Sequence, residues 1–179
     1  MITKKHIALL VAFFLLVFFY FRNKITSTIT KMIQLPTLHP SCRADFQNFI
    51  DEIESPQNGS LMVTITSAVR SVAKQLALYK AGLSPTEVSL HNFGFAIDIN
   101  IKGIDKNGND IELMMDSAIE DWLPYVNIAH NHNLTWGGYF TYRPGGDKVH
   151  FQWAVAKKAT VYLAAFEAKN IDSGGFVIV

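Results

Sequence analysis

The chain has little cysteine, and its beginning has no acidic residue. Cys42 is the only cysteine among 179 residues, which excludes an internal disulfide and a zinc site built from several thiolates. Residues 1–31 carry five Lys or Arg and no Asp or Glu, whereas the remainder carries 11 Lys or Arg against 15 Asp or Glu. The larger part is therefore negative and lacks the clustered basic face that nucleic-acid binding requires. Without repeats or low-complexity tracts, the chain is expected to form one domain plus a short segment.

The short segment contains an apolar run of 15 residues, Ile7 to Phe21, with basic residues on both sides. A membrane-spanning helix usually needs about 20 apolar residues and at least about 17, so this run also fits the core of a signal peptide. No Ala-x-Ala-like cleavage pattern follows, because residues 25–30 offer only Ser and Thr as small residues. We therefore expect an uncleaved membrane anchor at 1–24 and a polar linker at 25–40. Cleavage of a signal peptide is the alternative.

Residues 41–179 combine helical and strand patterns. Apolar residues at helical spacing predict four helices, over 41–55, 67–81, 116–131 and 156–169. Runs rich in branched and aromatic residues predict four strands, over 61–66, 95–101, 134–140 and 149–154. The turn residues Asn107-Gly108 predict a hairpin with a return strand at 111–113. Because these elements do not alternate as βαβ units, we predict an α+β domain.

Two short segments carry the residues of a hydrolytic metal site. SLHNFGFAID contains His91 and Asp98, and DKVHFQ contains Asp147 and His150. Catalytic zinc needs three protein ligands, an open position for water, and an unligated base nearby. Residues seven or three apart on one regular strand point to opposite faces, so the glycines at 94, 145 and 146 must turn the chain. Taken singly, each histidine fits an ordinary buried polar residue equally well, and the pair His130-x-His132 competes for the metal.

Other residues could complete such a site. Arg70 follows a predicted strand, and its guanidinium could hydrogen-bond a developing oxyanion or a substrate carboxylate. Trp136 and Tyr139 flank two glycines and could form a wall of the cleft. A surface ion pair is the alternative interpretation of Arg70, and a place in the core is the alternative for Trp136.

The motifs S-x-x-R-S-x-x-x-Q, S-x-H-N-x-G-x-A-x-D and W-G-G…D-x-x-H-F-Q together resemble the zinc D-alanyl-D-alanine carboxypeptidase and L-alanyl-D-glutamate endopeptidase family. The resemblance extends from about Thr64 to Trp153. It implies the small α+β fold shared with the hedgehog signalling domain. It also implies one zinc ion per chain, zinc ligation by His91, Asp98 and His150, base catalysis by Asp147, and catalysis or substrate binding by Arg70. We further predict substrate contacts by four residues, Gln75, Ser89, Trp136 and Tyr139.

The base position separates two branches of this family. Carboxypeptidases of the resistance type usually have Glu there, whereas phage-type endopeptidases typically have Asp followed by His-Phe-Gln, as in Asp147 and 150–152. The resemblance therefore favours an endopeptidase that cuts the L-Ala–D-Glu bond in the peptidoglycan stem. The alternatives are a D-alanyl-D-alanine carboxypeptidase and a non-catalytic, zinc-containing wall-binding module. Ala68-Val69 replaces the Gly-Tyr that more often precedes the arginine, which leaves the substrate contacts there open.

This activity requires a substrate outside the cytoplasm. Lys4 and Lys5 favour a cytoplasmic N-terminus, whereas Arg22 and Lys24 oppose it, so the charges alone do not decide the orientation. We expect a single-pass protein of the bacterial cell membrane with its domain outside, or a secreted or periplasmic protein after signal cleavage. The expected partners are stem peptides and the membrane, without nucleic acid or an obligate protein partner.

Overall fold

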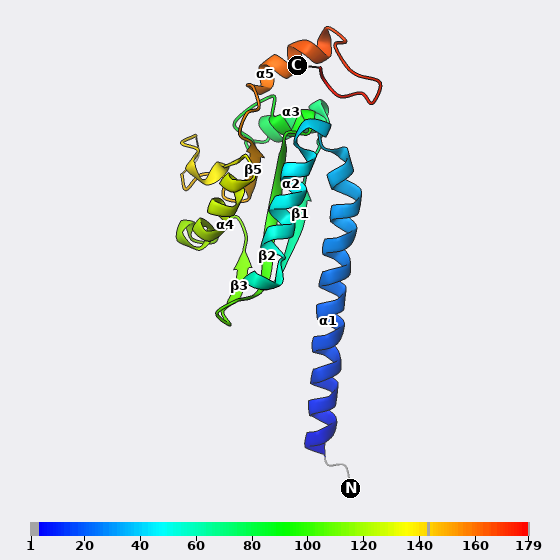
Figure 1. The fold of residues 1–179 in the computed structure, drawn as a ribbon, viewed down its shortest axis with the longest axis vertical. Coiled ribbons are helices and arrows are strands. Elements are labelled where there is room, and N and C mark those ends of the chain that lie inside the picture. Colours follow the sequence, from blue (N-terminus) through cyan, green and yellow to red (C-terminus); the bar gives the residue numbers. More distant parts are fainter. Residues whose placement is uncertain (1–3, 143, 179) are drawn as a thin grey trace.

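The computed structural model describes residues 4–142 and 144–178, and it consists of an antiparallel sheet with helices around it and one long helix beside it (Figure 1). The helices are α1 (Lys4–Gln34), α2 (Pro40–Ile53), α3 (Val72–Lys80), α4 (Ile119–Asn131) and α5 (Ala159–Glu167). The strands are β1 (Gly59–Ser67), β2 (Ala96–Asp105), β3 (Asp110–Leu113), β4 (Leu134–Trp136) and β5 (His150–Trp153). Short 3₁₀ turns are η1 (Leu35–Thr37), η2 (Pro56–Asn58), η3 (Leu90–Phe93) and η4 (Gly137–Tyr139). The predicted α+β class is thus confirmed as a mixed α/β domain with an antiparallel sheet.

Strand β2 is the centre of the sheet. The strand order is β1-β2-β5-β4, and β3 also pairs with β2 through the predicted hairpin. At its N-terminal end β2 places Asp98 opposite Ser67 of β1 and opposite His150 of β5. At its other end Asp105 lies opposite Gly59. The polar residues of the candidate site therefore gather at one end of the sheet, and the hairpin lies at the other.

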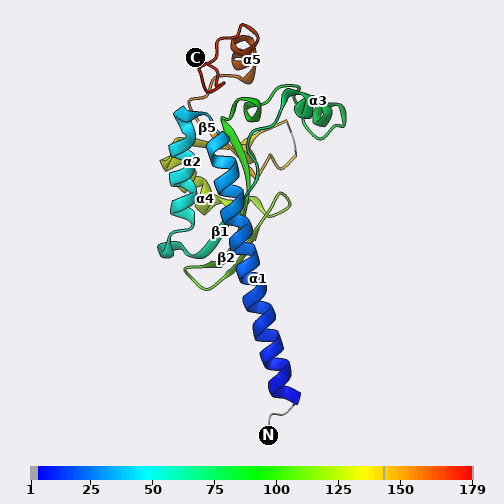
Figure 2. The same ribbon diagram turned by 90° about the vertical axis from the view of Figure 1, so that its right-hand side faces the viewer.

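The two faces of β2 differ in character. Ile97, Ile99 and Ile101 are fully buried, whereas Asp98 projects from the opposite face because successive side chains alternate along a strand. Helices α2 and α4 cover the apolar face (Figure 2). Phe49 of α2 packs on Phe151 of β5 with ring centroids 4.9 Å apart. Burial of this face, at about 25 cal/mol per Å² of apolar surface, holds the sheet in its register.

Helix α1 does not end where the apolar run ends. The segment 25–40, predicted as a linker, is helical through Gln34, and residues 1–3 of the predicted anchor lie outside the described residues. Ser27 Oγ donates to the carbonyl of Val63 at 2.6 Å, and Gln34 Nε2 donates to the carbonyl of Ile65 at 3.0 Å. Both acceptors belong to the edge strand β1, so the helix covers an edge that would otherwise be open. Packing on β1 outweighs the weak helix propensity of the Thr- and Ile-rich segment.

Two other elements are shorter than predicted. The helix expected over 67–81 begins at Val72, because the Ser71 hydroxyl accepts the N–H of Lys74 and caps it there. Arg70 therefore lies on a loop between β1 and α3. The strand expected over 134–140 ends at Trp136, where the chain enters the 3₁₀ turn η4.

Within the described residues, α1 is the one helix long and apolar enough to cross a membrane, with a candidate span at Leu9–Thr37 and a mean hydropathy of 1.7. None of the apolar window is buried inside the protein. Length and composition alone also fit a signal sequence, so this helix is a weak indication of a membrane span.

We expect Ser27→Ala to lower the free energy of unfolding by about 1–3 kcal/mol, because it leaves the Val63 carbonyl without its buried donor. Thr28→Ala is the matched control, since the Thr28 hydroxyl is exposed and bonds only to Lys24 of its own helix. Urea unfolding of the full chain in detergent micelles would measure both variants. Equal stabilities would show that the hydrogen bond from Ser27 to Val63 contributes nothing.

Candidate active site

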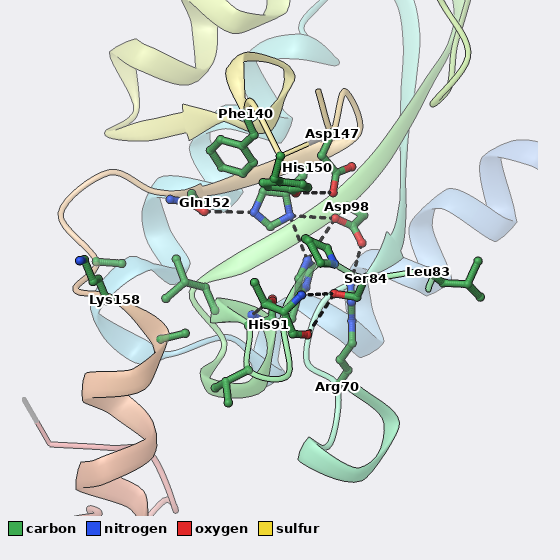
Figure 3. Close-up of a pocket in the computed structure, with 18 of the residues that line it drawn as sticks. Arg70, Leu83, Ser84, His91, Asp98, Phe140, Asp147, His150, Gln152 and Lys158 are labelled. Atoms are coloured by element: carbon green, nitrogen blue, oxygen red, sulfur yellow. Dashed lines mark hydrogen bonds and ion pairs between the residues drawn. The ribbon is translucent and has the colours of Figure 1, made fainter. Parts of the chain in front are cut away.

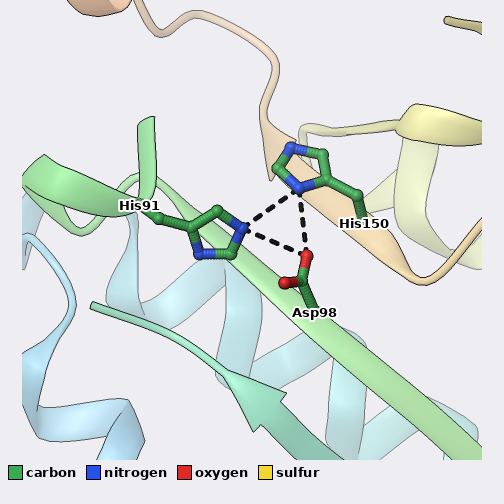
Figure 4. Close-up of side chains that lie close together, drawn as sticks. All are labelled: His91, Asp98 and His150. Carbon is green, nitrogen blue, oxygen red and sulfur yellow. Dashed lines mark hydrogen bonds and ion pairs between the residues drawn. The ribbon is translucent and has the colours of Figure 1, made fainter. Parts of the chain in front are cut away.

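Three side chains converge at the N-terminal end of β2 (Figure 4). The His91 Nε2, His150 Nδ1 and Asp98 Oδ1 atoms form a triangle in which each pair is 3.1 Å apart. His91 is 1% exposed and His150 is 7% exposed. The structure thus brings together the three residues that the sequence predicts as metal ligands, and it does so at the floor of an open face of the sheet.

Different local structures position the three residues. Asp98 and His150 are direct partners in the antiparallel pairing of β2 with β5, so their side chains lie on the same face. His91 comes from η3, which is capped at its start by Ser89 and ends at Gly94 with φ 75°. A side chain at Gly94 would place its Cβ 2.6 Å from the backbone nitrogen of His39. Gly94 therefore makes the predicted turn that returns the chain from His91 into β2.

Both imidazoles have an acceptor on the side away from the cluster. His91 Nδ1 lies 2.6 Å from the carbonyl oxygen of Ala68, and His150 Nε2 lies 3.2 Å from Gln152 Oε1. A neutral imidazole that donates from one nitrogen presents a lone pair on the other. In the tautomers that donate to these acceptors, the protons lie outside the cluster, and His91 Nε2 and His150 Nδ1 present lone pairs to its centre.

This donor set fits a zinc ion. Two nitrogen lone pairs and a carboxylate oxygen are ligands that zinc prefers, and three of them leave one tetrahedral position open. Ligands at about 2.0–2.2 Å in a tetrahedral arrangement are roughly 3.3–3.6 Å apart, within a few tenths of an ångström of the observed spacing. Hydrogen-bond acceptors behind the histidines are also a usual feature of zinc sites.

The protonation states suit ligation. Burial lowers the pKa of His91, and the nearby Asp98 carboxylate opposes that shift only in part. Burial also acts to raise the pKa of Asp98, but its hydrogen bonds with His150 and His91 outweigh burial and hold that pKa well below the usual range. Neutral His91 and ionised Asp98 are the forms that coordinate a metal.

Arg70 binds the second oxygen of the candidate carboxylate ligand. Its Nη2 donates to Asp98 Oδ2 at 2.8 Å and to Ser67 Oγ at 3.2 Å, and its Nη1 donates to Gln75 Oε1 at 3.1 Å. Gln75 is fully buried, and its Nε2 donates to Ser84 Oγ and to the Thr86 carbonyl, both at 2.8 Å. Gln75 therefore orients Arg70 from beneath, and Arg70 leaves Oδ1 of Asp98 to face the two histidines.

Asp147 lies beside the cluster, on a loop whose backbone packs closely against Gly137. Its N–H donates to the carbonyl of Gly137 at 2.8 Å, and its own carbonyl accepts the N–H of His150 at 3.1 Å. A Cβ at Gly137 would lie 2.6 Å from the Asp147 carbonyl oxygen and 2.9 Å from His150 Cβ. The absence of a side chain at Gly137 therefore leaves space for the loop that carries Asp147 and His150.

The cluster opens into a cavity of about 850 Å³ (Figure 3). The cavity is lined by Arg70, Ser89, His91, Asp98, Asp147 and His150 among the predicted residues. Side chains for which the sequence predicted no role also line it, among them Ser84, Met115, Phe140, Tyr142, Gln152 and Lys158. The Tyr142 hydroxyl donates to Asp147 Oδ2 at 3.3 Å, and the Phe140 ring lies 5.7 Å from the His150 ring.

Three predicted substrate contacts lie outside the cavity lining. Gln75 is buried beneath Arg70, as described above. Trp136 is fully buried, and its Nε1 donates to the Lys148 carbonyl at 2.7 Å, so its indole belongs to the core. Tyr139 is 60% exposed and packs edge-on against Trp136.

The competing histidine pair is not part of the cluster. His132 Nε2 lies 2.6 Å from Glu52 Oε2 of α2, and His130 is exposed at the end of α4. Of the contacts that the sequence reasoning missed, Gln152 had a signal, since it lies two residues beyond His150 on one strand face. The Ala68 carbonyl had none, because every residue carries a carbonyl group.

The fold and the site segment both resemble those of known peptidases. The structure resembles the crystal structure of Serratia marcescens L-Ala D-Glu endopeptidase ChiX with a TM-score of 0.52 and 18% sequence identity, covering 69% of this chain and 86% of that one. Residues 83–153 match the model of a family described as D-alanyl-D-alanine carboxypeptidase. That segment holds the whole His91–Asp98–His150 cluster and Asp147. The family resemblance inferred from the motifs is therefore confirmed, whereas the curated proteins provide no match.

We expect the full chain to bind one equivalent of Zn²⁺ and His91→Ala to lose that binding. Gln152→Ala should weaken it by about 10–100-fold, because the acceptor behind His150 is lost while the three ligands remain. His132→Ala is the control, since its partner is Glu52 and not the cluster. Titration calorimetry against a competing chelator would measure all three variants. Wild-type affinity in His91→Ala would rule out the cluster as the metal site.

Proposed function

We propose that this protein is a zinc-dependent peptidase that hydrolyses peptidoglycan stem peptides, most specifically the bond between L-Ala and D-Glu. The observation that carries the proposal is the triangle of three potential ligand atoms, 3.1 Å apart, in the lining of a cavity that also holds a separate carboxylate. The fold similarity to an L-Ala D-Glu endopeptidase supports the substrate class. We also propose that the domain has the small α+β fold shared with the hedgehog signalling domain.

His91, Asp98 and His150 would hold the metal, which supplies Lewis-acid polarisation of a carbonyl and a lowered pKa for water. Asp147 lines the same cavity without belonging to the ligand triangle, so its carboxylate is free to accept a proton from the attacking water. The same carboxylate then returns that proton to the leaving amine nitrogen. The Tyr142 hydroxyl bonds to Asp147 Oδ2 and orients the carboxylate.

Arg70 would act in two ways. Its contact with Asp98 Oδ2 fixes the orientation of a ligand, and its position in the cavity lining brings positive charge to the place where negative charge develops on the scissile carbonyl. Ser89 caps the turn that carries His91 and also lines the cavity, so it is the predicted substrate contact that the geometry favours.

A second candidate activity is removal of the terminal D-Ala. The description of the matching family model favours it, since that family is called D-alanyl-D-alanine carboxypeptidase. In such a reaction Arg70 would bind the free carboxylate of the substrate. The two activities share the metal site and differ in which bond lies over it.

We also propose that α1 anchors the domain in the bacterial membrane, with the cavity outside the cytoplasm. The apolar run and its basic flanks support this location. The predicted division into an anchor at 1–24 and a peptidase domain at 41–179 is retained. Residues 27–34, within the segment predicted as a linker, are assigned to the domain because they pack on β1.

Digestion of purified peptidoglycan by the full chain in detergent, with and without a chelator, tests the reaction. Mass spectrometry should find fragments that begin at D-Glu, and their formation should stop when the chelator is added. Release of single D-Ala residues would replace the endopeptidase assignment by the carboxypeptidase assignment. An undigested wall with zinc bound to the protein would reject both activities.

Asp147→Asn should lower the hydrolysis rate by roughly 10²–10⁴-fold, because an amide cannot accept the proton of the attacking water. Zinc affinity should stay near the wild-type value, since the Asp147 carboxylate is not one of the three ligand groups. Asp116→Asn is the matched control, as Asp116 is an exposed aspartate outside the cavity lining. An unchanged rate in Asp147→Asn would remove Asp147 as the base.

A further inference from the structure

Helix α1 has two parts with different surroundings. The part from Leu9 to Phe21 exposes large apolar side chains on every side, and none of its apolar window is buried in the protein. The part from Ser27 to Gln34 is bonded to the domain. The helix is continuous between the two parts, so the direction of one determines the direction of the other (Figure 1).

Three side chains on one face of the second part attach it to the domain. Ser27, Lys31 and Gln34 are spaced by four and three residues, which places them along one side of a helix. Ser27 and Gln34 bond to the carbonyls of Val63 and Ile65, and Lys31 Nζ forms an ion pair with Glu54 Oε2 at 2.5 Å. Leu35 and Leu38 follow directly and are buried. With these contacts the helix cannot swing independently of the sheet.

The contacts also define which end of the sheet lies toward the apolar part of the helix. Ser27 meets Val63 and Gln34 meets Ile65, so α1 and β1 run in the same direction. Gly59, opposite Asp105 of the β2–β3 hairpin, is therefore at the end nearer the apolar part. Ser67, opposite Asp98 of the candidate site, is at the far end, roughly 26 Å away along the strand.

We infer that the docked helix holds the domain in one orientation on a lipid bilayer, with the β2–β3 hairpin at the headgroups and the cavity facing away from the membrane. The inference rests on the membrane anchor proposed above. The strand from Val63 back to Gly59 is about 13 Å long. The same length along α1 corresponds to about nine residues before Ser27. The base of the hairpin, at Gly59 and Asp105, therefore lies level with about residue 18, near the end of the apolar run.

The composition of the hairpin limits its depth in the bilayer. Its tip carries Asp105, Lys106, Asn107, Asn109 and Asp110, and most of these side chains are exposed. Charged groups are expelled from the hydrocarbon core, whereas the headgroup layer accepts them. The hairpin consequently rests in the headgroup layer, and α1 tilts enough to keep the hairpin out of the core.

A pair of fluorescent labels tests this orientation. Cys42 is fully buried, so a thiol-reactive dye would label an introduced surface cysteine selectively. Asn107→Cys places the dye on the hairpin, and Leu83→Cys places it on the exposed rim of the cavity. The full chain would be reconstituted into phosphatidylcholine vesicles that carry a quencher on a fraction of the headgroups. Quenching should be several-fold stronger at position 107 than at position 83.

Insertion of ten Gly and Ser residues between Lys24 and Ile25 provides the control, because it keeps both parts of α1 but separates their directions. The difference between the two positions should then disappear. Equal quenching without the insertion would reject a fixed orientation, and stronger quenching at position 83 would reverse it. Protein that does not float with the vesicles would reject the bilayer as the partner. Since no readout depends on hydrolysis, failure of the peptidase proposal would be recognised separately.

Discussion

The antiparallel pairing of β2 with β5 is the constraint on which the rest of the site depends. It places Asp98 opposite His150 on one face and Ile97 opposite Phe151 on the other. A slip of β5 by one residue would turn the His150 imidazole toward the core and the Phe151 ring toward the cavity. Burial of the apolar face by α2 and α4 therefore also maintains the geometry of the candidate ligands.

Backbone groups position the candidate ligands around the β2–β5 pairing as much as side chains do. The Ala68 carbonyl orients His91, and the left-handed Gly94 returns the chain from His91 to β2. Gly137 has no side chain, so the Asp147 N–H can approach and bond to the Gly137 carbonyl. Each candidate ligand is thus supported by a second contact, as a preorganised site requires.

The sequence predicted which side chains come together in the site better than it predicted their surroundings. His91, Asp98 and His150 could be found because metal ligation demands particular residue types, and the nearby glycines explained their odd spacing. The helical state of 25–34 could not be found, because Thr and Ile have weak helix propensity and the stabilising partner is a strand edge some 30 residues away. Trp136 was misplaced for a related reason: an aromatic residue beside glycines fits a cleft wall and a core equally well.

The same limit applies to Arg70 and Gln75. Their residue types indicated a polar site, but the direction of each side chain depends on the loop between β1 and α3, whose extent was predicted incorrectly. Arg70 contacts a candidate ligand directly, and Gln75 contacts Arg70 from the side away from that ligand. Such a hierarchy follows from tertiary packing, which a single sequence does not reveal.

The cover that α1 provides for β1 has a practical consequence for handling the protein. A soluble fragment that begins at the apparent end of the helix, near Leu35, would uncover the carbonyls of Val63 and Ile65 on an edge strand. Bare strand edges are templates on which further chains add, so such a fragment would tend to self-associate. A fragment that begins just before Ser27 would keep the part of α1 that covers β1 and would lack only the apolar run.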